Sequence, residues 1–144
     1  MFVVDTNILI YAANRDSSFH PACRTFLEGW IGGAEGWHLT WGICYEFLSA
    51  VTHRRAFDPP WSAQGAWSFL ARVFASRSRG MLIPTDRHGQ VLASVIADTP
   101  RLSGMLLHDV ETVALMREHG VRTIYTRDMD FHRFAGIEVI DPVA

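Results

Sequence analysis

Short apolar runs alternate along the chain with longer segments in which apolar and polar residues recur at helical spacing. Four of the short runs have the length of a buried strand and cover residues 2–5, 37–40, 81–84 and 121–126. A fifth candidate strand is "IEVI", at residues 137–140. The helical segments cover residues 8–13, 21–30, 41–55, 62–77, 87–98 and 105–120.

Residues that start and stop helices stand between these segments. Thr6 or Asn7 is expected to open the first helix, Ser62 to cap the fourth, and Gly120 to end the last. Strands that alternate with helices indicate βαβ units. We therefore expect an α/β fold, with a mainly parallel sheet of four or five strands and helices on both faces. No repeat, linker or low-complexity segment divides residues 1–144, so we expect one domain.

The composition is that of a folded globular protein, with 49% apolar and 19% charged residues. No apolar stretch approaches the roughly 20 residues that span a bilayer, and no secretory signal is present, so we expect a cytoplasmic protein. Cys23 and Cys44 match no zinc or redox spacing and are expected to be buried thiols. All 13 basic residues are arginines, which excludes chemistry that needs a lysine, such as that of the P-loop.

Acidic residues follow two of the predicted strands. Asp5 ends the first strand, and Asp128 and Asp130 follow the fourth in "TRDMDF". The second strand runs directly into a helix that carries Glu46, whose neighbours on a helical wheel are mostly small. Because active sites of open α/β sheets form at the carboxyl ends of the strands, we expect these side chains to meet there.

Asp109 lies beside the apolar stripe of the last long helix, close to its N-terminus. Two roles stay open for it. A carboxylate at this place can cap the helix and interact favourably with its dipole, or it can join the acids at the strand ends. Glu111 and Glu118 lie elsewhere on the same helix, and we expect both to be solvated.

The sequence therefore predicts an acidic cluster made of Asp5, Glu46, Asp109 and Asp128, with Asp130 at its margin. Carboxylates gathered in one pocket repel each other unless a cation neutralises them. A site made only of carboxylate oxygens suits Mg²⁺ or Mn²⁺, and such sites commonly serve phosphodiester chemistry.

Two other aspartate-dependent classes of α/β protein fit poorly. Phosphotransfer receiver domains use a helper lysine, and this chain has none. Aspartate-nucleophile phosphatases carry a second aspartate two positions after the first, where this chain has Asn7.

Several cationic or titratable side chains adjoin the acidic motifs. His108 and His132 are the nearest histidines, but the seven histidines of the chain are scattered and do not suggest a metal site. Arg127 and Arg133 lie beside Asp128 and are candidate contacts to a phosphate-bearing substrate, as are the two histidines. For each of the four, an ordinary surface position remains the alternative.

Four segments resemble, in the right order, motifs of the PIN-domain nucleases and, more closely, of the VapC-type toxins of bacterial toxin–antitoxin pairs. They are "VVDTNILIY", "YEFL", "LHDVETVALMREHG" and "IYTRDMDFHRF". The resemblance covers nearly the whole chain, and its first and last segments are the most specific. It implies a parallel sheet of four or five strands between helices and the activity of a Mg²⁺- or Mn²⁺-dependent endoribonuclease.

The resemblance also implies a role for individual residues. The four metal-binding acids of the family match Asp5, Glu46, Asp109 and Asp128, and an additional acid of many members matches Asp130. The polar residues that orient these acids match Thr6, Asn7 and Thr126. No acid is missing, so we expect an active member. The family often has alanine after the third acid, where this chain has Val110.

A VapC-type toxin would hydrolyse RNA phosphodiester bonds, with transfer RNA or a ribosomal RNA loop as the expected substrate. Arg127, Arg133, His108 and His132 would then be candidate RNA contacts. The resemblance further implies a homodimer and a small VapB-type antitoxin whose tail fills a groove of the toxin. Two alternatives stay open, namely a PIN nuclease of RNA processing and a non-catalytic RNA-binding or scaffold domain.

Overall fold

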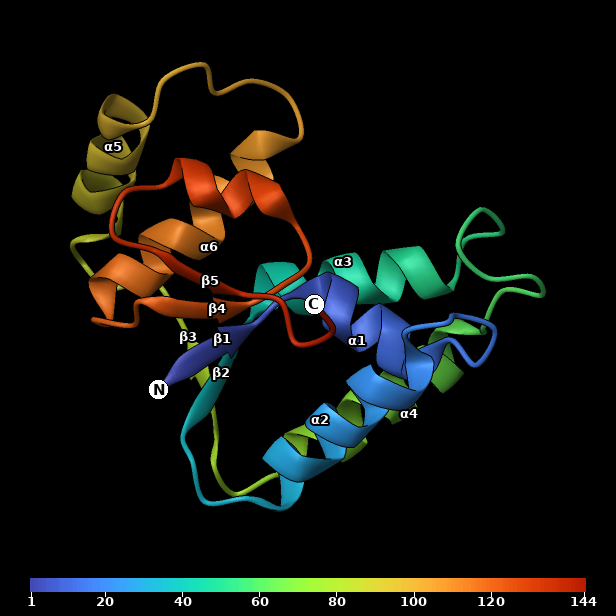
Figure 1. Cartoon of the computed structure of the whole chain (residues 1–144). Coiled ribbons are helices and arrows are strands. Elements are labelled where there is room, and N and C mark those ends of the chain that lie inside the picture. The colour runs from blue at the N-terminus through green and yellow to red at the C-terminus, as the bar shows by residue number, and fades with distance from the viewer.

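The computed structural model describes residues 1–144 and contains one five-stranded sheet in which all neighbouring strands are parallel. The strands are β1 (Phe2–Val4), β2 (Trp37–Thr40), β3 (Arg79–Leu82), β4 (Thr123–Tyr125) and β5 (Glu138–Ile140). Their order is β3-β2-β1-β4-β5, so β1 is the central strand (Figure 1). The predicted α/β fold with a parallel sheet is confirmed, and "IEVI" supplies its fifth strand.

Six α-helices and one 3₁₀-helix surround the sheet. They are α1 (Thr6–Ala13), α2 (His20–Gly32), α3 (Trp41–Val51), α4 (Ala63–Phe74), α5 (His88–Asp98), α6 (Leu106–Glu118) and η1 (Met129–Arg133). Figure 1 shows α5 and α6 on one side of the sheet and α1, α2 and α4 on the other. Helix α3 packs against α1, α4 and α6 and so joins the two groups. None of the helices has the length and apolar character needed to cross a membrane.

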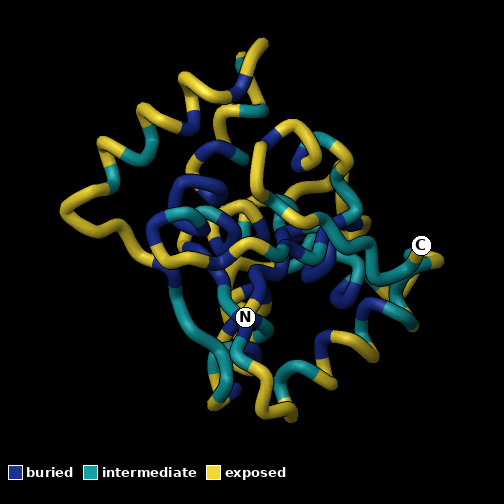
Figure 2. Tube along the Cα trace, turned by 60° about the vertical axis from the view of Figure 1, so that its left-hand side comes forward, coloured by how far each residue is buried: buried dark blue, intermediate teal, exposed yellow.

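The core follows from the apolar runs of the sequence. Every residue of β1 is buried, because the central strand is covered on both faces. Burying a side chain such as Phe2, which is 2% exposed, stabilises the fold by about 1.5–3 kcal/mol. Thirty buried apolar residues form one continuous cluster, which Figure 2 shows in the middle of the molecule. Cys23 and Cys44 are buried free thiols, as predicted.

Polar side chains at the ends of two strands start the helices that follow. Asp5 caps α1, because its carboxylate accepts a hydrogen bond from the backbone N–H of Thr6. The sequence placed the opening at Thr6 or Asn7. The helix does begin at Thr6, but the side chain that caps it is Asp5. Thr40 caps α3 in the same way, and Ser62 caps α4 as predicted.

Several elements are shorter or shifted relative to the sequence prediction. Strand β3 begins two residues earlier than predicted and ends before Pro84, which lacks the N–H of a ladder hydrogen bond. The helix predicted for residues 41–55 ends at Val51, where the Thr52 hydroxyl donates to the carbonyl of Leu48 at 2.7 Å. Gly120 follows α6 with a φ of +68°, the left-handed conformation that a helix stop requires.

The strand order places a reversal of the chain path beside the central strand. From β1 the chain passes to β2 and β3 on one side of it, and then crosses to β4 and β5 on the other. Asp5 directly follows β1, and Thr126 directly follows β4. In open α/β sheets, ligands bind at the carboxyl ends of the strands at such a reversal. The fold thus brings Asp5 and Thr126 to the expected position of a site.

Glu118 is buried, so the prediction that it is solvated is wrong. Its side chain is 0% exposed and pairs with His88. It also accepts hydrogen bonds from the backbone N–H of Thr85 at 2.9 Å and from the hydroxyl of Thr85 at 2.6 Å. Burial by itself raises the pKa of Glu118, but the bonds from His88 and Thr85 outweigh burial and lower it to about 2. These contacts fix the end of α6 to the segment that begins α5.

Glu118→Gln is expected to destabilise the protein by about 2 kcal/mol at pH 7, because the charge-assisted bonds of a buried carboxylate are lost. The pKa of Glu118 is lower in the folded state than its ordinary value of 4.5. The stabilisation is therefore complete above pH 4.5 and disappears as the pH falls toward 2. Urea denaturation of both proteins between pH 7 and pH 3 measures the difference, which should shrink with falling pH.

Glu35→Gln is the matched control for this prediction, because Glu35 is an exposed glutamate in a loop. An equal and small effect of both substitutions at pH 7 would mean that the buried pairs of Glu118 add nothing to stability.

Candidate active site

Three segments that lie far apart in the sequence meet at the carboxyl ends of β2, β1 and β4. Asp5 follows β1, α3 carries Glu46 after β2, and Asp128 follows β4 two residues after Thr126. Strand β1 pairs directly with both β2 and β4. The acids of the predicted cluster therefore lie on neighbouring strands or on the elements that these strands lead into.

Asp5 is 8% exposed and is held by three hydrogen bonds. One carboxylate oxygen accepts from the backbone N–H of Thr6 at 2.8 Å. The other accepts from the side-chain amide of Asn7 at 2.8 Å and from the hydroxyl of Thr126 at 2.6 Å. Donors on both oxygens fix the rotation of the carboxylate. Asp5 is thus a preorganised acid at the base of the site.

The same polar residues extend the network to the other acids. Thr6 donates through its hydroxyl to Glu46 at 2.9 Å. The hydroxyl oxygen of Thr126 accepts from the backbone N–H of Asp128 at 2.9 Å, and Asp128 in turn accepts from the backbone N–H of Asp130 at 2.9 Å. Thr6, Asn7 and Thr126 are the residues that the sequence resemblance assigned to orient the acids. Each of them contacts at least one acid directly.

Two adjoining cavities open beside this network. The larger, of about 460 Å³, lies between α3 and the start of α6. The smaller, of about 210 Å³, lies between α6 and the segment after β4. Both cavities are lined by Glu46, Met105, His108 and Asp109, so they are two parts of one acidic site. Asp5 contributes to the larger part, and Asp128 and Asp130 contribute to the smaller.

Two of the acids bind protons unusually well. Burial raises the pKa of Asp5 from 3.8 to about 6. The hydrogen bonds from Thr126 and Thr6 oppose this shift, and the charges of Glu46 and Asp128 reinforce it. Burial is the largest cause that raises the pKa of Asp109 from 3.8 to about 7. Repulsion by four other acids adds to the shift, namely Asp5, Asp128, Glu46 and Asp130. The fold therefore gathers more negative charge than the site itself neutralises.

The chemistry of these donors fits a divalent cation. All five acids present carboxylate oxygen, the ligand that Mg²⁺ and Mn²⁺ prefer, and a cation would relieve the repulsion that raises the pKa of Asp109. As the side chains lie, however, no three Asp, Glu, His or Cys residues are close enough together to hold one ion. The donor set fits the metal, while the exact coordination is not preformed.

Asp109 is not a helix cap. It lies in the first turn of α6, whose cap position is Met105, and no side chain caps this helix. Its carboxylate instead lines both parts of the acidic site. Of the two roles that the sequence left open for Asp109, the geometry favours membership of the acidic cluster.

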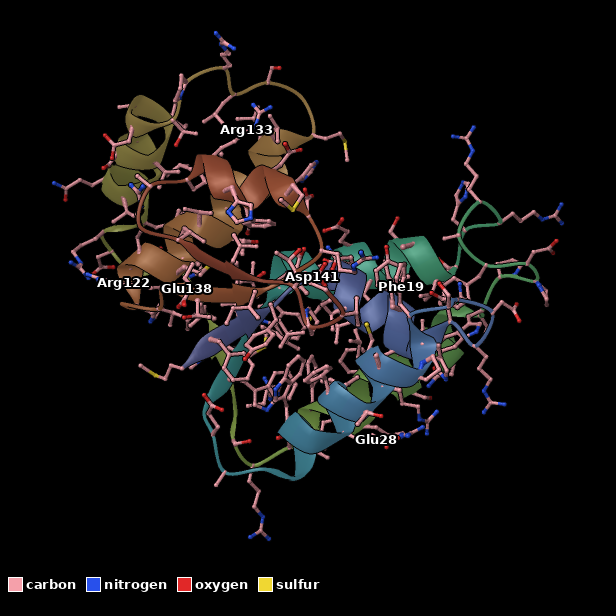
Figure 3. All side chains as sticks on the ribbon, in the orientation of Figure 1. Phe19, Glu28, Arg122, Arg133, Glu138 and Asp141 are labelled. Atoms are coloured by element: carbon pink, nitrogen blue, oxygen red, sulfur yellow. The ribbon has the colours of Figure 1, made fainter.

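The four candidate RNA contacts lie in different surroundings. His108 lines both parts of the site. His132 is exposed and lines neither. Arg133, labelled in Figure 3, pairs with Asp130 at 3.2 Å, and both side chains are about half exposed. Of the four, His108 is therefore placed best to reach a bound substrate.

Arg127 is engaged elsewhere. Its guanidinium donates to Asp141 at 3.1 Å and lies 3.8 Å from the centre of the Phe19 ring. Figure 3 labels Phe19 and Asp141 where the C-terminal segment passes α1. With both contacts made, Arg127 fastens the C-terminal segment to the start of α2 and is not free to bind a phosphate. The sequence interpretation of Arg127 as a substrate contact is not supported by this geometry.

Sequence reasoning did not assign several residues of the larger cavity to the site, among them Tyr45, Met105 and the exposed Glu111. Tyr45 and Met105 are among the most exposed large side chains, at 69% and 77%. Tyr45 lies off the apolar stripe of Ile43 and Phe47 on α3, so a helical wheel could have shown it as an outward-facing aromatic residue. No comparable pattern marks Met105, which precedes α6.

Comparison with known proteins agrees with the fold. Residues 2–137 match the PIN domain. Ribonuclease VapC48 of Mycobacterium tuberculosis is 31% identical over 138 residues, which cover 96% of this chain and 94% of that protein. The chain also superposes on two solved structures.

One of these structures is Mycobacterium tuberculosis VapC20, a sarcin–ricin loop cleaving toxin. The superposition has a TM-score of 0.66 and 17% sequence identity, and it covers 96% of this chain and 99% of VapC20. The other is VapBC2 from Rickettsia felis bound to a DNA fragment from its promoter, with a TM-score of 0.68, 13% identity and 96% coverage of both chains. The matched domain, the nearly full-length relative and the shared fold together lead to one conclusion: the chain belongs to the PIN-domain family, among its VapC ribonucleases.

Proposed function

We propose that this protein is a Mg²⁺- or Mn²⁺-dependent endoribonuclease that hydrolyses RNA phosphodiester bonds as the toxin of a type II toxin–antitoxin pair. The observation that carries the proposal is the buried Asp5, held by three hydrogen bonds at the reversal of a parallel sheet and surrounded by further acids. A non-catalytic scaffold would gain no stability from a buried carboxylate that is surrounded by further acids. The name of the relative VapC48 supports the ribonuclease activity.

The metal would be held by Asp5, Glu46, Asp109 and Asp128, with Asp130 at the margin of the site. A bound Mg²⁺ or Mn²⁺ would lower the pKa of a coordinated water and stabilise the charge that develops on the phosphate. Thr126 and Asn7 keep the Asp5 carboxylate in one orientation, and Thr6 does the same for Glu46. Asp109, with a pKa of about 7, exchanges its proton near neutral pH and would release it when a cation binds.

The expected products carry 5′-phosphate and 3′-hydroxyl ends, because the attacking water would displace the 3′-oxygen from the phosphorus. Transfer RNA or a ribosomal RNA loop is the proposed substrate class. The ribosomal loop gains support from VapC20, a relative of the same fold that is a sarcin–ricin loop cleaving toxin.

The proposed antitoxin has a suitable surface between α1, α2 and α4. A cavity of about 350 Å³ there is lined by apolar side chains, including Leu27, Ile31 and Phe69. Arg15 and Arg72 also line it. We propose that an antitoxin segment with apolar and acidic residues fills this groove. VapBC2, a relative of the same fold, supports a partner of this kind, and a homodimer remains part of the proposal.

We expect RNA cleavage to fall at least about 100-fold in each of three variants, Asp5→Asn, Asp109→Asn and Asp128→Asn. Loss of a metal ligand should lower activity at least as much as loss of a residue that orients such a ligand. Cleavage of a total RNA preparation in Mg²⁺ or Mn²⁺, with mapping of 5′-phosphate ends, measures this. Asp86→Asn is the control, because Asp86 is an exposed acid that follows β3 at the same edge of the sheet. Full activity in all three variants would refute the proposed site.

In EDTA, Asp109→Asn is expected to stabilise the protein by about 1–2 kcal/mol at pH 8, an amount reduced for its partial exposure. The folded-state pKa of Asp109 is raised to about 7. Ionised Asp109 therefore destabilises the folded state above pH 7, and this penalty is absent below the ordinary pKa of 3.8, so the advantage of the variant should vanish at pH 3. Thermal melts at both pH values test this, and a loss of stability at pH 8 would indicate a structural role.

Arg72→Glu is expected to weaken binding of the purified antitoxin at least about tenfold and to leave RNA cleavage unchanged, because it places a negative charge in the proposed groove. Arg54→Glu is the matched control, since Arg54 is exposed on the loop after α3 and does not line the groove. Titration calorimetry measures both affinities. An equal effect of the two variants would place the antitoxin elsewhere.

A further inference from the structure

We infer that Tyr45 stacks on an unpaired base next to the scissile phosphate of the RNA, and that Met105 provides a second apolar contact at the same place. The inference rests on the proposed function and adds to it the part of the substrate that the protein grips. It concerns two residues that hold no metal and that take no part in the hydrogen-bond network of Asp5.

The position of both residues supports this role. Tyr45 immediately precedes Glu46 on α3, and Met105 precedes α6, on whose first turn Asp109 lies. Both line the cavity of about 460 Å³ that also contains Asp5, Glu46 and Asp109. Their exposures of 69% and 77% leave large apolar surfaces open at the cavity. A nucleotide whose phosphate reached the acids would bring its base within reach of these surfaces.

The charge of the site leaves few other ways to bind RNA. No arginine lines either part of the acidic site, and the chain contains no lysine. Arg127 and Arg133, the arginines that flank Asp128 and Asp130 in the sequence, are already paired, Arg127 with Asp141 and Arg133 with Asp130. Phosphate neutralisation by basic side chains, the usual source of affinity for nucleic acids, is therefore weak within the cavity itself. Base stacking supplies attraction that does not depend on charge.

Neighbouring aromatic residues support Tyr45 in this role. Trp41, one helical turn earlier on α3, has its ring centre 6.5 Å from that of Tyr45. Trp41 is itself fixed by an edge contact with Phe74, at 5.8 Å between ring centres. A ring that is restrained on one side loses less conformational entropy when a base covers its other side.

This role defines a class of substrate. A base inside a duplex is already stacked and paired, so Tyr45 can stack only on a base in a loop, a bulge or a single strand. Stacking on tyrosine is tolerant of sequence, because every base has an aromatic face. The protein should thus select an unpaired nucleotide at the cleavage position without strong preference for its identity.

The test uses the full chain with Asp128→Asn as parent, which by the proposed function binds RNA without cleaving it. The probe is a short single-stranded RNA of random sequence that carries a central 2-aminopurine, whose fluorescence is quenched on stacking. Adding Tyr45→Ala should weaken binding between about 5-fold and 100-fold and remove the quenching. Tyr45→Phe should behave as the parent, because it keeps the ring. Met105→Ala should weaken binding less than Tyr45→Ala.

Three further measurements exclude simpler explanations. The loss of affinity in Tyr45→Ala should be the same at low and at high salt, because stacking releases no counterions. Trp67→Ala is the matched control, since Trp67 is 42% exposed on α4 and lines neither part of the acidic site. Its RNA binding should equal that of the parent. Thermal melts of all variants exclude a loss of folding.

Three outcomes would overturn the inference. If Tyr45→Ala binds and quenches as the parent does while the wild-type protein cleaves RNA in Mn²⁺, stacking is wrong and the proposed function stands. If Tyr45→Ala changes only the oligomeric state in sedimentation, the ring contacts a second copy of the chain. If the wild-type protein neither binds nor cleaves RNA with Mg²⁺ or Mn²⁺, the proposed function fails and the inference fails with it.

Discussion

The hydrogen bond from the hydroxyl of Thr126 to the carboxylate of Asp5, at 2.6 Å, connects the two halves of the molecule at its functional edge. Asp5 follows the central strand and caps α1, while Thr126 follows β4 and accepts a hydrogen bond from the backbone of Asp128. The bond therefore helps to set the relative position of the first and the fourth acid of the motif. Asn7 is the second link, because its side-chain amide donates to both Asp5 and Thr126.

The same arrangement creates a conflict between stability and chemistry. Asp5 has three hydrogen-bond donors, whereas an ionised carboxylate offers about four acceptor positions. Asp5 also lines the larger part of the acidic site. Burial raises the pKa of Asp5 to about 6 in spite of its three donors, so the protein keeps an acid that it only partly satisfies. The incomplete satisfaction is what leaves an oxygen available for a cation.

The fold was predictable from the sequence because it depends on periodicity. The apolar runs "FVV" and "WHLT" are buried strands, and the parallel sheet follows from their alternation with helices. The candidate site followed from the position of Asp5 at a strand end and from the resemblance of four motifs. Contacts between distant residues were not predictable. Glu118 is polar and lies on a helix, and nothing near it in the sequence indicates that Thr85 and His88 bury it. Arg127 was misread for the same reason, since its partner Asp141 lies on the C-terminal segment.

The sequence distance spanned by the central bond bears on how the protein is made. Thr126 follows Asp5 by 121 residues, so a ribosome must synthesise the PIN domain as far as the end of β4 before the first acid finds its partner. An incomplete chain that ends before β4 lacks Thr126 and Asp128, and β1 has no neighbour on that side. Such a product cannot assemble the acidic site. For an enzyme that attacks RNA, this order of assembly delays activity until the fourth strand of its domain has been translated.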